Sequence, residues 1–297
     1  MKIKADWLTW LHAYKKREIE KTFFACPLHC FKQGLELGAG DGFQGVLLSK
    51  YIHHLVSTEI NEVILSRESD DSVEYKQCCA QEAVKNGQDN FFDVVYSSNL
   101  LEHLVYPAGV LHGIGRILKN DGITIHIMPT PFWKVCHLLL HAPINCIAII
   151  EQLARVRGIG NRLGEMRFLV REFLTGLITG ANTMIDRADQ EAIMTGNNPE
   201  GARIRPGFLR RLLMPLPHGV SATNRAEFAA FSKRRWIKDF QEAGFDLIAI
   251  RKGPAASGYG LGWAWADWII EKMGLASELI YIAQKRGQTS RYAQYFL

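Results

Sequence analysis

Three glycines and one acid in the first quarter of the chain have the spacing of a nucleotide-binding turn. An apolar run ends in the sequence ELGAGDG (36–42), and the next apolar run ends in Glu59. Glycines at alternate positions let the backbone come close to a ligand with no Cβ atom in the way. An acid that closes the following strand is placed to accept hydrogen bonds from a ribose diol. Together the two features predict a site for a nucleoside-containing cofactor.

The glycine spacing indicates which cofactor. A dinucleotide fingerprint is G-x-G-x-x-G, and its third glycine lets helix and strand pack closely. Counted from Gly38 and Gly40, that third position is Phe43, so a nicotinamide dehydrogenase is disfavoured. The pattern present, E-x-G-x-G-x-G, resembles motif I of the class I S-adenosylmethionine-dependent methyltransferases. In that family the loop packs on the methionine part of the cofactor.

Two further segments carry the same resemblance. FFDVVYSSNLLEHLVYP (91–107) is similar to the strand-four segment of the small-molecule, type 11-like methyltransferases. The turn at 120–123 resembles the family's L-K-P-G-G turn into strand five, although Asn and Asp replace Pro and Gly. The matches cover residues 33–129. They imply S-adenosylmethionine as methyl donor and S-adenosylhomocysteine as product.

The resemblance also implies roles for single residues. Glu59 would bind the ribose hydroxyls, Ile60 would pack on the adenine, and Gln81 would border the adenine edge. Ser97 would offer its backbone to the methionine ammonium. The expected cofactor-binding residues are Glu36, Gly38, Ala39, Gly40, Glu59, Ile60, Gln81, Ser97 and Asn99.

Two histidines are candidate proton acceptors, because histidine exchanges protons near neutral pH. His103 follows the predicted fourth strand, where ligands reach the cleft of such sheets. His218 lies in a short proline-rich turn. Each has a structural alternative, since His103 is often structural in the resembling family and His218 could simply cap a loop. No metal site is expected, because Cys26-x-x-x-Cys30 has no second ligand pair.

Alternating apolar strands and amphipathic helices predict an α/β fold of parallel βαβ units. The resemblance implies a Rossmann-like, doubly wound sheet of seven strands in the order 3-2-1-4-5-7-6, with strand 7 antiparallel and a helical insertion after strand 5. The expected strands are 31–37, 54–59, 73–79, 91–97, 122–128, 244–250 and 279–284. Helices are expected over 5–24, 43–51, 62–69, 100–118, 132–150 and 232–243.

The whole chain, 1–297, is predicted to be a single methyltransferase domain with four parts. These are an N-terminal helical lid (1–30), a cofactor-binding half (31–129), a helical insertion or substrate cap (130–231), and C-terminal strands (232–297) with an aromatic loop at 254–268. An alternative for the aromatic residues is ordinary core packing.

The composition is that of a globular protein, with 47% hydrophobic and 22% charged residues and a net charge of +5. Six scattered cysteines and the lack of a signal-peptide pattern at the N-terminus predict a cytoplasmic protein. The apolar run 132–150 is too short and too polar at its centre to cross a bilayer. It is expected to cap the active site or to dip into a membrane surface.

These features predict methyl transfer to an oxygen or nitrogen of a sugar, a lipid-linked glycan or a secondary metabolite. The acceptor's identity, the oligomeric state and the use of a general base stay open. One alternative is a tRNA or protein methyltransferase that uses the arginines of 155–211, although few aromatic residues for base stacking lie between them. Another is a non-catalytic scaffold that keeps the cofactor site.

Overall fold

The computed structural model describes residues 7–61, 72–158, 213–215, 217–256 and 264–297. Internal contacts divide the chain into two units, each described by itself. The first unit consists of Met1–Cys136 together with Val220–Leu297, and the second unit is His137–Gly219. Both points at which the chain passes between the units therefore lie in the segment between the expected fifth and sixth strands.

The first unit is built on one seven-stranded sheet in the order β3-β2-β1-β4-β5-β7-β6. Strands β1 to β5 pair in parallel, whereas β7 runs antiparallel to both β5 and β6. The predicted fold is confirmed. The strands are β1 (Phe31–Leu37), β2 (Ile52–Glu59), β3 (Val73–Gln77), β4 (Phe92–Ser98), β5 (Leu118–Pro129), β6 (Phe245–Lys252) and β7 (Glu278–Lys285).

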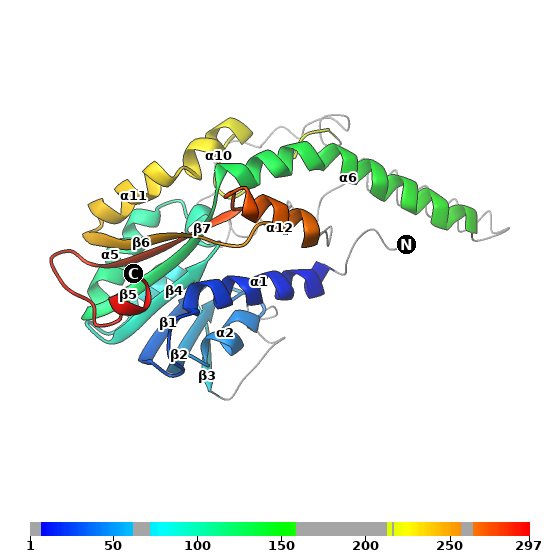
Figure 1. Ribbon diagram of the computed structural model, residues 1–297. Coiled ribbons are helices and arrows are strands. Elements are labelled where there is room, and N and C mark those ends of the chain that lie inside the picture. The colour runs from blue at the N-terminus through cyan, green and yellow to red at the C-terminus, as the bar shows by residue number, and fades with distance from the viewer. Residues whose placement is uncertain (1–6, 62–71, 159–212, 216, 257–263) are drawn as a thin grey trace. The chain divides into compact units, whose positions relative to one another are not determined.

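Helices cover both faces of this sheet (Figure 1). On one face lie α1 (Trp7–Phe23) and α2 (Phe43–Leu48), and on the other α4 (Ala80–Asn86), α5 (Pro107–Ile117) and α11 (Lys233–Glu242). The remaining described elements are η1 (Leu101–His103), α6 (Pro131–Gly158), α10 (Asn224–Ala230), α12 (Ala264–Lys272) and η2 (Ala293–Tyr295). Helix α6 begins in the first unit and continues into the second.

Strand β4 shows how the two hydrophobic cores arise from sequence. Val94 and Tyr96 join the core under α1 and α2, and Val95 between them joins the core under α5 and α11. Successive strand residues point to opposite faces, so a strand covered on both faces presents apolar residues to each of them. Every residue of β4 is buried.

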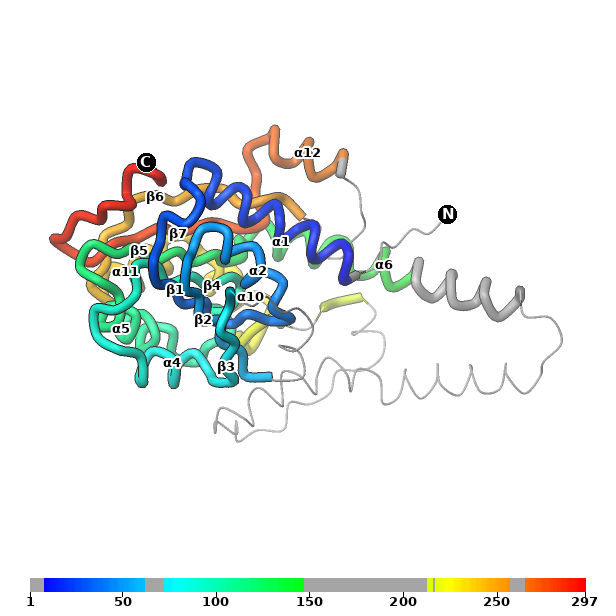
Figure 2. Tube along the Cα trace, turned by 90° about the horizontal axis from the view of Figure 1, so that it is seen from below, coloured from blue at the N-terminus to red at the C-terminus, as the bar shows by residue number. Residues whose placement is uncertain are grey.

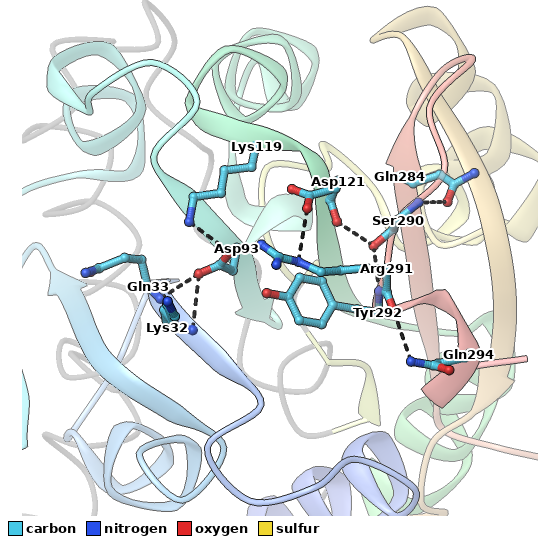
Figure 3. A network of polar contacts seen from close by, with 10 residues as sticks. All are labelled: Lys32, Gln33, Asp93, Lys119, Asp121, Gln284, Ser290, Arg291, Tyr292 and Gln294. Carbon is cyan, nitrogen blue, oxygen red and sulfur yellow. Dashed lines mark hydrogen bonds and ion pairs between the residues drawn. The ribbon is translucent and has the colours of Figure 1, made fainter.

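A buried aspartate fastens the amino ends of the central strands (Figure 3). Asp93 accepts hydrogen bonds from the Gln33 amide at 2.8 Å and from Lys119 Nζ at 2.9 Å, and Arg291 lies 3.3 Å away. Burial alone would raise the pKa of Asp93, but the bonds from Lys119 and Gln33 hold it below its usual value. The aspartate of the F-D-x-V segment thus lies at the sheet edge opposite to the glycine loop.

A buried ion pair joins the first turn of α6 to α10. The side chains of Lys134 and Glu227 are fully buried and in contact, and the rings of Trp133 and Phe231 lie 6.0 Å apart. Within the described residues, no helix has both the length and the apolar character needed to cross a bilayer.

The structure differs from the sequence expectation in several elements, including α4, which was not expected as a helix. Residues 100–118 were expected as one helix, but η1 is followed by a new helix that begins at Pro107, a residue whose missing N–H suits a first helical position. Strand β5 begins at Leu118 rather than at 122. The last third of the expected aromatic loop belongs to the helix α12. Tyr259, Trp263 and the expected helix 62–69 lie outside the described residues.

Candidate functional site

The glycine loop after β1 adopts conformations that favour glycine. The φ angles of Gly38, Gly40 and Gly42 are +76°, +59° and +88°. The amides of Gly38 and Ala39 both donate to the Thr58 carbonyl at 2.9 Å, which fastens the loop to β2. A Cβ atom on Gly40 would meet no atom of the described residues within 4 Å. The loop therefore leaves open space beside its backbone, as a ligand-binding turn requires.

Glu59, at the end of β2, is bonded directly to this loop. Its Oε2 accepts from the Gly40 amide at 2.9 Å, and its Oε1 accepts from the amides of Ile60 and Asn61 at 2.9 and 3.2 Å. A carboxylate offers about four lone-pair sites, so acceptor capacity remains for an outside donor such as a ribose hydroxyl. The structure thus brings Gly40, Glu59 and Ile60 together at one edge of the sheet.

Glu36 lies deeper than the glycine loop. Its side chain is buried between β1 and α2, and Oε2 accepts from Ser57 Oγ at 2.6 Å. Burial raises the pKa of Glu36 to about 7, against the lowering effect of the Ser57 hydrogen bond. The Glu36 carboxylate thus contacts the protein interior, and a Cβ on Gly45 would come within 3.1 Å of it.

The end of β4 presents backbone and one amide side chain. Ser97 is buried and its hydroxyl is 2.7 Å from His126 Nδ1, so its side chain is occupied within the sheet. Asn99 has a φ of +51°, and its Nδ2 donates to Glu278 Oε1 at 2.7 Å. Glu278 opens β7, opposite Pro129 in the register, and therefore belongs to the same edge of the sheet.

Helix α1 adds charged residues that sequence reasoning did not assign to the site. Lys15 Nζ donates to Ser98 Oγ at 2.6 Å and to Glu18 Oε2 at 3.0 Å. The other oxygen of Glu18 accepts from Tyr96 OH and Gln44 Nε2, both at 2.8 Å. The only sequence signal was a Lys and a Glu three positions apart, which is also what an exposed helix face looks like.

The pKa values of two buried carboxyl groups next to Lys15 are shifted in opposite directions. Burial raises the pKa of Glu278 well above its usual value, and the charge of Glu18 raises it further. Burial also acts on Glu18, but Lys15 and the hydrogen bonds to Glu18 outweigh it and lower its pKa. Neighbouring carboxyls with separated pKa values are held most easily when one is protonated and the other ionised.

Helix α1 also contacts the glycine loop, through a residue near the N-terminal end of the helix. His12 Nε2 is 2.6 Å from Asp41 Oδ2, and the His12 ring stacks on Phe43 with centroids 3.9 Å apart. Asp41 Oδ1 also accepts from the Phe43 amide at 3.3 Å. Helix α1 is therefore bonded both to the glycine loop and, through Lys15, to the end of β4.

The two candidate catalytic residues belong to different units. His103 lies in η1, where burial lowers its pKa to about 4. Its neighbour Glu102 is buried, has no hydrogen-bond partner for its carboxylate among the described residues, and has a pKa raised to about 8 by burial. His218 belongs to the second unit. Gln81 is an exposed residue of α4.

The geometry agrees with what comparison with known proteins shows. Residues 35–126 match the family model for a methyltransferase domain. The ubiquinone biosynthesis O-methyltransferase of Methylococcus capsulatus is 29% identical over 131 residues, which are 42% of this chain and 52% of that protein. The chain thus spans about half the length of this curated relative.

Two solved structures share the fold over most of their length. One is a complex of a methyltransferase with the Trm112 methyltransferase activator from Haloferax volcanii (TM-score 0.51, 11% identity, covering 94% of this chain and 93% of that chain). The other is an S-adenosylmethionine-dependent methyltransferase from Listeria monocytogenes (TM-score 0.50, 14% identity, 94% and 99%). Residues 35–126 therefore match a methyltransferase domain, and the sheet that contains them has the fold of S-adenosylmethionine-dependent methyltransferases.

The described residues fit this cofactor. The open space at Gly40, the remaining acceptor capacity of Glu59 and the backbone at the end of β4 all lie at the carboxyl edge of the parallel strands. In open α/β sheets ligands bind outside this edge, where the strand order reverses. Here the reversal falls between β1 and β4.

Proposed function

We propose that the chain is a methyltransferase that transfers the methyl group of S-adenosylmethionine to an oxygen or nitrogen of a small or amphiphilic acceptor. The observation that carries the proposal is the bond between the Gly40 amide and Glu59, next to open space. When bound, the cofactor supplies a methyl group activated by a positively charged sulfur. The acceptor class we propose is a sugar, a lipid-linked glycan or a secondary metabolite.

The chain's own residues bind and orient in this proposal. Glu59 holds the ribose hydroxyls, Ile60 packs on the adenine, and Gln81 borders its edge. The backbone of Gly38, Ala39 and Gly40 faces the methionine part, with Glu36 as a buried support below it. Ser97 contributes backbone, because its hydroxyl is already bonded to His126. Alignment of nucleophile and methyl group can contribute roughly 7–11 kcal/mol to such a reaction.

The proton that the methyl acceptor loses must be taken up by another group. We propose His103 and His218 for this role, as the sequence suggests. Burial lowers the pKa of His103 to about 4, so the ring is unprotonated at neutral pH and acts as a weak base. Asn99 holds the buried carboxyl group of Glu278 at the same edge of the sheet.

We propose that α1 acts as a lid, because its bonds to Asp41 and Ser98 lie on either side of the reversal point. We also propose a cytoplasmic location with peripheral contact to a membrane surface. The support for that contact is the exposed apolar face of α12.

Isothermal titration with S-adenosylhomocysteine tests the cofactor site. Wild type should bind, and Glu59→Ala should bind at least tenfold more weakly because the carboxylate both shapes the loop and meets the ribose. Glu74→Ala, an exposed acid on β3, is the matched control and should bind like wild type. No binding to wild type would remove the proposal.

The acceptor is found by a second experiment. Extract incubated with the protein and methyl-labelled S-adenosylmethionine is fractionated, and the labelled product is identified by mass spectrometry. A labelled small molecule or lipid supports the proposed acceptor class. Label in RNA or protein would assign the chain to the alternative class instead, and bound cofactor without any labelled product would indicate a scaffold.

A further inference from the structure

Helix α12 is attached to the protein by its acidic residues. Asp267 lies 3.9 Å from Arg17, and Glu271 forms ion pairs with both Arg17 and Lys21 of α1. Glu271 Oε1 also accepts from the Ala255 amide at 2.9 Å. Figure 2 shows α12 lying next to α1. The polar side of this helix is therefore turned toward the protein.

The opposite side of α12 exposes large apolar residues. Trp265 is 66% exposed, Trp268 60% and Met273 69%, and Ile269 is exposed as well. Together with Lys272 these residues follow the spacing i, i+3, i+4, i+7, i+8, so they form one continuous stripe, which we name the α12 face. A helix of a water-soluble domain normally turns such a stripe inward. In α12 the apolar stripe faces outward instead.

The charges near the α12 face are positive. Lys272 Nζ lies 5.6 Å from the ring centre of Trp268. Lys252 Nζ lies close to Gly274, where the helix ends. The two acids of α12, Asp267 and Glu271, are both engaged with basic residues of α1. An anionic partner would therefore meet lysines at the end of the stripe and would not meet the acids of this helix.

We propose that the α12 face is a docking surface for an anionic lipid bilayer. Tryptophan and lysine side chains combine an apolar body with a polar tip, which suits the boundary between acyl chains and headgroups. A helix with an apolar face and flanking lysines lies in that boundary and is attracted by anionic lipids. The inference deepens the membrane contact proposed above, and it would place the site where amphiphilic acceptors are found.

Vesicle co-sedimentation tests the docking surface. Wild-type protein is mixed with vesicles of phosphatidylcholine alone or of phosphatidylcholine containing one quarter phosphatidylglycerol. We expect binding to the anionic vesicles, weaker binding to the neutral ones, and loss of the difference at high salt. Trp268→Glu should reduce binding to the anionic vesicles by roughly tenfold or more, because a charge replaces an interfacial ring.

A matched control and two further measurements separate the outcomes. Leu28→Glu introduces the same charge at another exposed apolar residue and should bind vesicles like wild type. Failure of wild type to bind anionic vesicles, or equal binding by Trp268→Glu, overturns the proposal. Light scattering that shows a dimer disrupted by Trp268→Glu would instead assign the face to a second copy. Titration of the same samples with S-adenosylhomocysteine keeps this result distinct from the methyltransferase proposal, since Trp268→Glu should bind it normally.

Discussion

Lys15 of the first helix donates a 2.6 Å hydrogen bond to Ser98, 83 residues further along the chain at the end of β4. The same ammonium neutralises Glu18, whose side chain is completely buried. One lysine therefore joins the N-terminal helix to the central strand of the sheet and supplies the charge that a buried carboxylate needs.

Lys15→Met should destabilise the protein because it leaves Glu18 without its cation. Removing one partner of a buried pair costs ~3–5 kcal/mol. Lys16→Met is the control, since that pair with Glu20 is exposed and contributes ~1 kcal/mol or less. Urea denaturation at neutral pH measures both variants. Equal midpoints for the two would contradict the inferred role of Lys15.

Gly40→Ala should weaken cofactor binding beyond its effect on stability. The new Cβ would strain a backbone at φ +59° by about 1–2 kcal/mol and would project into the open space at the loop. We expect a loss of S-adenosylhomocysteine affinity of roughly tenfold or more. The measurement is calorimetric titration, with denaturation of the same samples.

Gly244→Ala provides a matched comparison for Gly40→Ala. Gly244 also has a positive φ, +86°, and a Cβ there would likewise meet no atom within 4 Å in the part of the chain that the structure describes, but Gly244 lies before β6. The two variants should lose similar stability, and only Gly40→Ala should lose affinity. Similar affinity losses in both would mean that the effect is general destabilisation.

Glu102→Gln should make stability less dependent on pH. Burial raises the pKa of Glu102 to about 8 in the folded chain, above the usual 4.5. Because the folded chain then binds more protons, the contribution of Glu102 is complete below pH 4.5 and is lost as pH rises toward 8. The difference corresponds to an upper limit of roughly 5 kcal/mol.

Denaturation of wild type and Glu102→Gln between pH 5 and 9 checks this expectation. The variant should gain relative to wild type as pH rises through that window. The exposed Glu74→Gln should follow wild type throughout. Parallel curves for wild type and Glu102→Gln would show that Glu102 is ionised in the folded chain at neutral pH.

Lys134→Met should destabilise the first unit by ~3–5 kcal/mol, because it leaves the fully buried Glu227 unbalanced. The double variant Lys134→Met/Glu227→Leu should recover most of this loss, since a buried ion pair is often replaceable by apolar residues. Denaturation of the four members of this cycle measures the coupling. Independent, additive effects of the two substitutions would argue against a direct pair.

The sequence pattern predicted the sheet and the glycine loop because both depend on local spacing. The run ELGAGDG and Glu59 are separated by one strand–helix–strand unit, and their bond follows from that topology. Lys15 and Glu278 escaped prediction because their partners, Ser98 and Asn99, lie far away in sequence.

The helix in the aromatic stretch was not predicted, for a different reason. Its glycines and tryptophans are typical of a loop, but Ala264–Lys272 forms a helix whose acids pair with α1. The helical spacing of the exposed residues can be seen only once Asp267 and Glu271 are known to face the protein.

The chain leaves the first unit after Cys136 and returns to it at Val220. Lys134 lies just before the exit and Glu227 just after the return. This pair joins the two segments of the first unit next to the break in the chain. A change in the length or composition of segment His137–Gly219 would leave both members of this pair in place, since each belongs to the first unit.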